Sequence, residues 1–190
     1  MTVDGGLEFN ETGYPTWESC LRRKFFDYNK AYGTQYAWEK LYKNYDGIQD
    51  QFAEFWKTVA VYFKDEPNVM GYEVINEPFT ANYHSNPFYY IPYLNDIFHL
   101  TPLYDKVNEK IREVDQNTLL FFEPTITGNY IFLYRAPGGS AYNNRSVLSF
   151  HVYCGAVTAE GEPTHMDECH RQDTNQFSAK WGWAQYFGLA

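Results

Sequence analysis

The sequence has few cysteines, a shortage of positive charge and no long apolar run, and each shortage excludes a class of protein. Its 190 residues hold three cysteines and no CxxC pair, so a zinc site of paired thiolates is not expected. The net charge of −9 argues against a nucleic-acid partner, because phosphate backbones attract lysine and arginine. No run of 18 apolar residues occurs, which predicts no transmembrane segment. Residues 1–15 lack the basic start and apolar stretch of a signal peptide.

The three cysteines leave the pairing open. Cys154 and Cys169 flank a polar loop, and a disulfide between them is one arrangement. In that case Cys20 either stays free or pairs outside the chain. Two glycosylation sequons, Asn10-Glu11-Thr12 and Asn144-Arg145-Ser146, are compatible with a secreted protein.

Aromatic residues, in contrast, are abundant. They make up 20% of the chain, with 18 Tyr, 15 Phe and 5 Trp. Flat aromatic faces pack well on the C–H surfaces of sugar rings and lipid tails. A tyrosine-rich core and surface with no ligand is the competing interpretation.

Helical and strand patterns alternate after a tyrosine-rich, helical region at 18–45. Apolar residues at spacings of four and three predict a helix from Ile48 to Tyr62. The short run of Val, Ile and Tyr between turn residues predicts a strand at residues 69–75. Thr101-Pro102 predicts a second helix, with Thr101 as N-cap and an inner stripe of Leu103, Val107, Ile111 and Val114. Strands are expected at 119–122 and 147–150. This alternation predicts an α/β fold with a parallel sheet covered by helices.

Polar residues follow each predicted strand. Asn76-Glu77 follows the first, Glu123 the second, and His151 with Tyr153 the third. Polar groups at the C-terminal ends of successive parallel strands are the usual site layout of a (β/α)8 TIM barrel.

Glu77 is the candidate for acid–base chemistry. Cleavage of a glycosidic bond needs one carboxylic acid to protonate the leaving oxygen and a second carboxylate to attack or to activate water. We expect the pKa of Glu77 to be raised, because Val74, Ile75 and Pro78 provide an apolar setting. The Asn76 amide is placed to hydrogen-bond a sugar hydroxyl. A plain strand-to-loop turn is the alternative.

Several segments resemble glycoside hydrolase family 5 and, within it, endoglycoceramidases and related glycosylceramidases. The segment 71–79 resembles the family's fourth-strand signature, and similar stretches cover nearly the whole chain in family order. These further stretches are 9–17, 103–106, 120–124, 144–149 and 151–154.

The resemblance implies residue roles. Glu77 matches the general acid/base, and Asn76 matches the asparagine that contacts the sugar 2-hydroxyl. Tyr153 matches the sixth-strand tyrosine that orients the nucleophile, and His151 matches a histidine lining the sugar subsite. No metal or other cofactor is part of this chemistry. The implied substrate is a glycosphingolipid or oligosaccharide, and the implied compartment of a full-length parent is extracellular or the lysosomal or endomembrane lumen.

Other family features have no match. The early-strand arginine or lysine, the third-strand histidine and the seventh-strand nucleophilic glutamate are not found. A complete barrel needs about 250 residues. We therefore expect an incomplete barrel of roughly strands four to six, within one partial catalytic domain over residues 1–190. Residues 1–47 would be the loop and helix after strand three, and residues 48–190 the barrel segments.

Three functional interpretations remain open. The first is a retaining hydrolase segment that acts between glycan and ceramide, with its nucleophile outside the chain and no activity alone. The second is a β-glucanase or cellulase-like hydrolase that acts on a polysaccharide. The third is a non-catalytic remnant.

The remaining candidates are assigned lesser roles. Glu123 is expected to give hydrogen-bonded support. We expect Glu160, Glu162 and Glu168 to be solvated in a polar loop. His165 and His170 are expected to lie in that loop without a metal. The aromatic stretch 79–100 follows the catalytic strand and should stand over the site, either lining an apolar slot or packing on itself.

Overall fold

A parallel sheet of three strands forms the centre of the fold. The computed structural model describes residues 7–22, 25–91, 93–126, 135–154, 158, 162 and 164–189. The strands are β1 (Gly71–Glu73), β2 (Leu119–Phe122) and β3 (Ser146–Leu148), in the order β1-β2-β3. Tyr72 pairs with Leu120, and Phe121 pairs with Val147. The predicted parallel sheet is confirmed, with each strand next to its neighbour in the sequence.

Glycine at position 71 lets β1 lie close to β2. A Cβ atom there would stand 2.7 Å from the Leu119 carbonyl oxygen and would also collide with the Phe121 ring. Such overlap with backbone cannot be relieved by a rotamer change. Gly71 is therefore a packing requirement of the β1–β2 pair.

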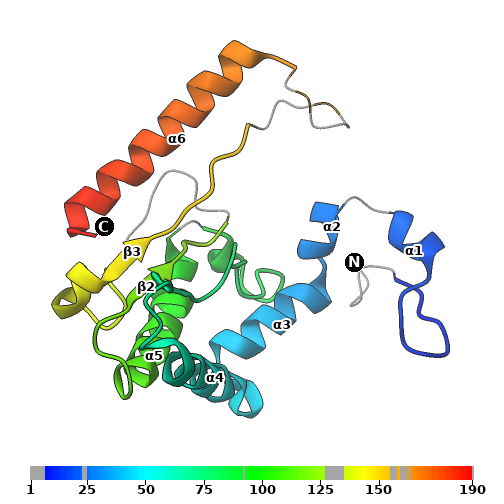
Figure 1. Ribbon diagram of the computed structural model, residues 1–190. Helices are drawn as coiled ribbons and strands as arrows, with labels where there is room; N and C mark the ends of the chain where they lie inside the picture. The colour runs from blue at the N-terminus through cyan, green and yellow to red at the C-terminus, as the bar shows by residue number, and fades with distance from the viewer. Residues whose placement is uncertain are drawn as a thin grey trace.

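The described ranges contain six α-helices, whose arrangement Figure 1 shows. Helices α4 and α5 pack side by side against the sheet, whereas the first three helices form an arm at the N-terminal side. Four short helical turns connect these elements. The α-helices are α1 (Trp17–Leu21), α2 (Phe25–Asn29), α3 (Tyr32–Tyr42), α4 (Ile48–Phe63), α5 (Thr101–Arg112) and α6 (Met166–Phe187). The short turns are η1 (Tyr45–Gly47), η2 (Pro87–Tyr90), η3 (Asp96–Leu100) and η4 (Ser140–Arg145).

Helix α4 occupies the expected residues, but its buried face is rotated from the predicted stripe. Ile48, Phe55 and Tyr62 are exposed, Tyr62 by 80%. Ala53 and Ala60 are buried instead. Phe52 and Val59 of the predicted stripe are partly buried against the core, so the stripe is only partly confirmed.

Helix α5 confirms the predicted inner stripe. Leu103, Val107 and Ile111 are fully buried, and Tyr104 beside them packs edge-on against Phe122 of β2. The predicted N-cap at Thr101 is wrong. The π-helical turn η3 runs directly into α5, so the backbone at Leu100 is already helical and no cap is needed there.

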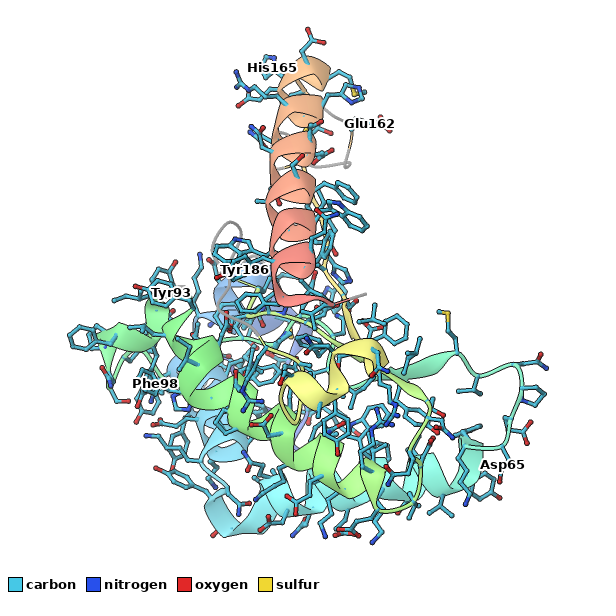
Figure 2. All side chains as sticks on the ribbon, turned by 90° about the vertical axis from the view of Figure 1, so that its left-hand side faces the viewer. Asp65, Tyr93, Phe98, Glu162, His165 and Tyr186 are labelled. Atoms are coloured by element: carbon cyan, nitrogen blue, oxygen red, sulfur yellow. A yellow bond between two sulfur atoms is a disulfide. The ribbon has the colours of Figure 1, made fainter. Side chains whose placement is uncertain are left out.

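Helix α6 was not expected from the sequence. Residues 166–187 form a continuous helix of 22 residues, so Glu168 and His170 lie on a helix and not in a loop. Figures 1 and 2 show α6 standing away from the body, with His165 at its outer end and Tyr186 near the rest of the chain. None of the helices in the described ranges has both the length and the apolar character needed to cross a bilayer.

Candidate active site

Glu77 lies just beyond β1, where the chain turns away from the sheet. The Val74 N–H still donates to the Phe121 carbonyl at 3.2 Å, which extends the β1–β2 pairing by one residue. Glu77 then adopts a left-handed backbone conformation, with φ of 46°. Its N–H donates to Oε2 of Glu123 at 2.7 Å. The turn therefore directs the Glu77 carboxylate along the C-terminal edge of the sheet.

His151 and Tyr153 come to Glu77 from the extended segment after β3. The His151 Nδ1 atom lies 2.7 Å from Oε1 of Glu77, and the Tyr153 hydroxyl donates to the same oxygen at 2.9 Å. The hydroxyl also lies 3.0 Å from His151 Nδ1. Three residues that the sequence placed after two different strands thus meet at one carboxylate oxygen. Asn76, the fourth predicted residue, is exposed beside Glu77.

The electrostatics of Glu77 differ from the expectation. Hydrogen bonding from His151 lowers the pKa of Glu77, with Tyr153 adding to the effect and partial burial opposing it. The predicted rise is therefore wrong for this arrangement, because donors stabilise the ionised carboxylate more than the apolar neighbours destabilise it. The same contact with Glu77 raises the pKa of the His151 imidazole and of the Tyr153 hydroxyl.

Glu123 lies beneath this cluster at the end of β2. It is only 3% exposed, and burial raises the pKa of its carboxyl group. The Tyr104 hydroxyl donates to the Glu123 carbonyl at 2.7 Å and accepts a hydrogen bond from the Glu123 N–H at 3.3 Å. A side chain so buried cannot reach a substrate. The hydrogen-bonded supporting position that the sequence predicted for Glu123 is present.

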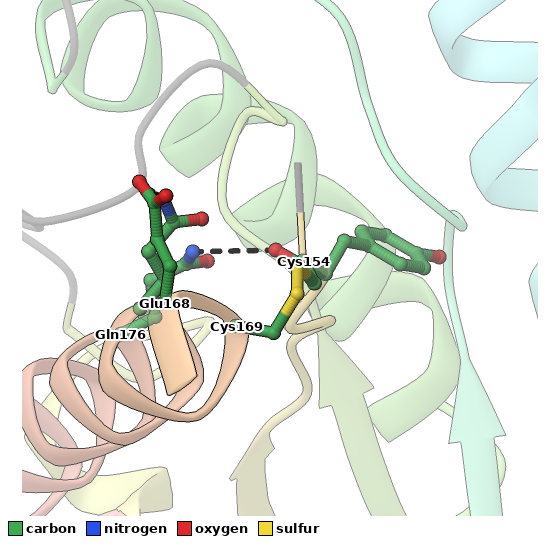
Figure 3. Close-up of a disulfide and its surroundings, with 6 residues drawn as sticks. Cys154, Glu168, Cys169 and Gln176 are labelled. Atoms are coloured by element: carbon green, nitrogen blue, oxygen red, sulfur yellow. Dashed lines mark hydrogen bonds between the residues drawn. A yellow bond between two sulfur atoms is a disulfide. The ribbon is translucent and has the colours of Figure 1, made fainter. Parts of the chain in front are cut away.

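Helix α6 holds the backbone of residues 151–154, which we call the site segment. The ammonium group of Lys180 donates to the His151 carbonyl at 2.6 Å, and the Gln176 amide donates to the Tyr153 carbonyl at 3.5 Å. A disulfide joins Cys154 to Cys169, the arrangement that the sequence allowed (Figure 3). Cys20 is a free thiol. These contacts were missed because no helix was predicted after Tyr153, and Glu168 and His170 were expected in a polar loop.

The aromatic stretch 79–100 divides between packing and exposure. Phe79 is buried, and Tyr89 packs edge-on against His99 with ring centres 4.6 Å apart. Phe88 and Phe98, in contrast, are 66% and 62% exposed. The stretch is therefore neither wholly self-packed nor wholly an open slot.

The outlying acidic and histidine residues form no second centre. Within the described ranges no group of three or more His, Cys, Asp or Glu is placed to hold a metal ion. Glu162 is exposed, and Glu168 lies in the first turn of α6 and accepts a hydrogen bond from Gln172. Glu160 lies outside the described residues.

Fold and site together define a class. Consecutive parallel strands, with a carboxylate, an imidazole and a phenol gathered at their C-terminal ends, are the arrangement of an enzyme site on a (β/α) barrel. The model of the family described as Cellulase (glycosyl hydrolase family 5) matches residues 27–190. The chain therefore belongs to glycosyl hydrolase family 5.

Two curated relatives within the similarity range of this chain are both named endoglycoceramidase. The chain is 43% identical over 145 residues to an endoglycoceramidase of Hydra vulgaris and 41% identical to one of Cyanea nozakii. Each match covers 75% of this chain, but only 28% and 29% of the relatives. The chain thus spans less than a third of the length of the curated relatives that it matches.

Solved structures support the fold. Endo-glycoceramidase II from Rhodococcus sp. superposes with a TM-score of 0.66 at 21% identity, over 96% of this chain and 39% of that one. Its ganglioside GM3 complex gives a TM-score of 0.63. An endogalactoceramidase gives 0.55 at 20% identity, over 84% of this chain and 32% of that one. The predicted incomplete TIM barrel is confirmed as three strands with their helices.

Proposed function

We propose that this chain carries the acid–base half of the active site of a retaining hydrolase that separates glycan from ceramide in glycosphingolipids. The observation that carries the proposal is the Glu77 carboxylate, which receives hydrogen bonds from His151 and Tyr153 at the C-terminal edge of the sheet. Glu77 would protonate the leaving oxygen and later deprotonate water. Asn76, exposed beside it, would bind the sugar 2-hydroxyl, and His151 and Tyr153 would line the sugar subsite.

The nucleophile would come from outside the described residues. Glu123 is the neighbouring carboxylate, and its burial prevents contact with an anomeric carbon. A further carboxylate brought near Glu77 would raise the pKa of Glu77 by like-charge repulsion. That rise would supply the protonated acid for the first step. Loss of the nucleophile's charge in the glycosyl intermediate would lower the pKa again, and Glu77 would then act as base.

The lipid-linked substrate is favoured by two findings. Both curated relatives are named endoglycoceramidase. The aromatic stretch after β1 also exposes Phe88, Tyr90 and Phe98, which suit an apolar chain next to a polar sugar site. The competing candidate is a polysaccharide substrate, because the matching family model is described as Cellulase. Turnover of glucosylceramide and of cellulose oligomers by one preparation separates the two.

Substitution of Glu77 tests its role. In a parent enzyme that hydrolyses a glycosphingolipid, Glu77→Gln should reduce turnover by 10²-fold or more, on the order expected for a lost acid/base. Substrate binding should persist. Glu77→Ala should retain a larger share of wild-type activity on an aryl glycoside, whose leaving group needs no proton, than on the glycosphingolipid. Glu66→Gln, at an exposed position outside the site, is the matched control. Turnover of Glu77→Gln at the wild-type rate would refute the assignment.

We also propose an extracellular or luminal compartment. The Cys154–Cys169 disulfide favours an oxidising environment, and both sequon asparagines, Asn10 and Asn144, are exposed to a glycosyltransferase. Expression through the secretory pathway should give a product whose mass falls on treatment with an N-glycanase. The mass of an Asn10→Gln, Asn144→Gln double variant should not change on the same treatment. A wild-type product of unmodified mass would count against this compartment.

A further inference from the structure

Glu123 is an unusually buried acid for a residue so near a site edge. A carboxylate that loses water needs donors in return, or it becomes costly to bury. Its Oε2 has one, the Glu77 N–H at 2.7 Å. Its Oε1 has no hydrogen bond of good geometry, but the His151 Nε2 atom lies 3.3 Å away. Oε2 of Glu123 thus faces Glu77 and Oε1 faces His151, while the neighbouring Glu73 carboxyl group helps to raise the pKa of Glu123.

The contact with Glu77 is made at a strained backbone. A non-glycine residue in the left-handed region costs about 1 kcal/mol or more, and Glu77 has φ of 46°. In this conformation its N–H points at Glu123 and its side chain points at His151. The Glu123 carboxylate therefore stabilises the backbone turn that aims the Glu77 side chain.

The contact with His151 completes a bridge. The imidazole has Glu77 at Nδ1 and Glu123 at Nε2, so it spans carboxylates from two adjacent strand ends. The other groups facing it are Tyr153, which contacts Nδ1, and Glu73, which adds negative charge. From α6, Lys180 binds the His151 backbone carbonyl.

We propose that Glu123 is a positioning residue of this site, which fixes the Glu77 backbone through Oε2 and pairs with the His151 imidazolium through Oε1. The inference rests on the proposed acid/base role of Glu77 and names the residue that prepares it. When His151 is charged, the exchangeable proton of the pair lies between Nδ1 and Glu77 Oε1, which are 2.7 Å apart. In the exchange the Nδ1–H bond breaks and the Oε1–H bond forms. Imidazolium and carboxylate become imidazole and carboxylic acid, and no net proton is taken up.

Nitrogen NMR of the 190-residue chain tests the arrangement without any activity. With ¹⁵N-labelled histidine, His151 of the wild-type chain should keep protons on both ring nitrogens to a higher pH than His151 of a Glu123 variant, because two carboxylates face its ring. Glu123→Gln removes the charge and keeps an oxygen for the Glu77 N–H. The pKa of His151 should fall in that variant, because one of the two carboxylates that face its ring is lost. Glu66→Gln, an exposed control, should not change this pKa.

The outcomes separate this inference from the proposed function. A Glu123→Gln chain whose His151 titrates as in wild type would overturn the role of Glu123 even if Glu77 is the acid. If the variant fails to fold, a His151 of the wild-type chain that titrates at or below about 6.5, the ordinary value for histidine, would likewise overturn the bridge. In an active parent, Glu123→Gln should lower kcat more than it changes KM and should shift the acidic limb of the pH–rate profile. If Glu77→Gln retains full turnover while His151 behaves as described, the catalytic assignment fails and the bridge remains.

Discussion

Lys180 of α6 donates a hydrogen bond to the backbone carbonyl of His151 at 2.6 Å, which ties a peripheral helix to the residue that contacts Glu77. Lys180 is only 4% exposed, and burial lowers the pKa of its ammonium group. Its ammonium also lies 5.4 Å from the centre of the Phe150 ring. A buried lysine directed at a backbone oxygen of the site suggests that α6 is a support of that site.

Replacement of this lysine should loosen the site segment. Lys180→Met keeps most of the side-chain volume but leaves the His151 carbonyl without its donor, which should reduce the free energy of unfolding by about 1–2 kcal/mol. Urea unfolding at pH 7 measures the change. Arg171→Met, at an exposed position on the same helix, should alter stability by less than about 0.5 kcal/mol. Equal effects of the two substitutions would show that the Lys180 contact contributes nothing specific.

The disulfide should contribute through the unfolded chain. Cys154 and Cys169 are 15 residues apart in sequence, and closure of a loop of that length stabilises the native state by about 3 kcal/mol. A Cys154→Ser, Cys169→Ser double variant should lose roughly that free energy of unfolding in urea. Protease cleavage within α6 should also become faster. Cys20→Ser, which removes a free thiol, is the matched control and should unfold as wild type does.

His99 should make the fold sensitive to acid. Burial lowers the pKa of His99 to about 4, and its ring stacks on Tyr42 with centres 5.5 Å apart. The unfolded chain binds this proton near pH 6.5, whereas the native state resists it until about pH 4. Stability should therefore fall as the pH drops from about 6.5 to about 4, by up to about 3 kcal/mol.

The substitution His99→Phe should remove this part of the pH dependence. Urea unfolding at pH 7 and pH 5 would measure it in both proteins. His84, which is exposed, provides the control His84→Gln, and this variant should retain the wild-type slope. A His99→Phe chain that loses stability in acid as steeply as wild type would contradict the assignment.

Gly71 offers a test of sheet packing. Gly71→Ala places a methyl group 2.7 Å from the Leu119 carbonyl oxygen, so β1 must move away from β2. Overpacking of this kind costs about 1–3 kcal/mol. Gly182→Ala is a useful contrast, because a Cβ there meets nothing within 4 Å and the helical position favours alanine. Thermal unfolding should therefore show a lower midpoint for the first variant and an equal or higher one for the second.

Periodicity predicted the sheet and its two covering helices well. The strand 119–122 was predicted to the residue, because four consecutive apolar residues between polar turns leave little choice of boundary. Helix α6 was not predicted, because its sequence lacks a comparable apolar pattern. Its polar residues show no continuous apolar stripe, and it is held by a disulfide and by hydrogen bonds between distant residues. Such contacts leave no local signal in the sequence.

The sequence predicted which residues gather at the candidate site, but it did not predict the direction of the Glu77 pKa shift. The parallel order of β1, β2 and β3 brings Glu77, Glu123 and His151 to one edge once the strands are recognised. The lowered pKa of Glu77 depends on which atoms donate to it, and that follows from a left-handed turn and from the path of residues 149–154. Neither is encoded in the spacing of the residues.

The order of the strands also has a consequence for handling the protein. Within the described residues β1 and β3 each have one strand neighbour, so no strand pairs with the outer backbone edge of either. Open edges accept strands from other molecules. The 190-residue chain should therefore self-associate as its concentration rises, and dilute conditions should keep it monomeric in solution.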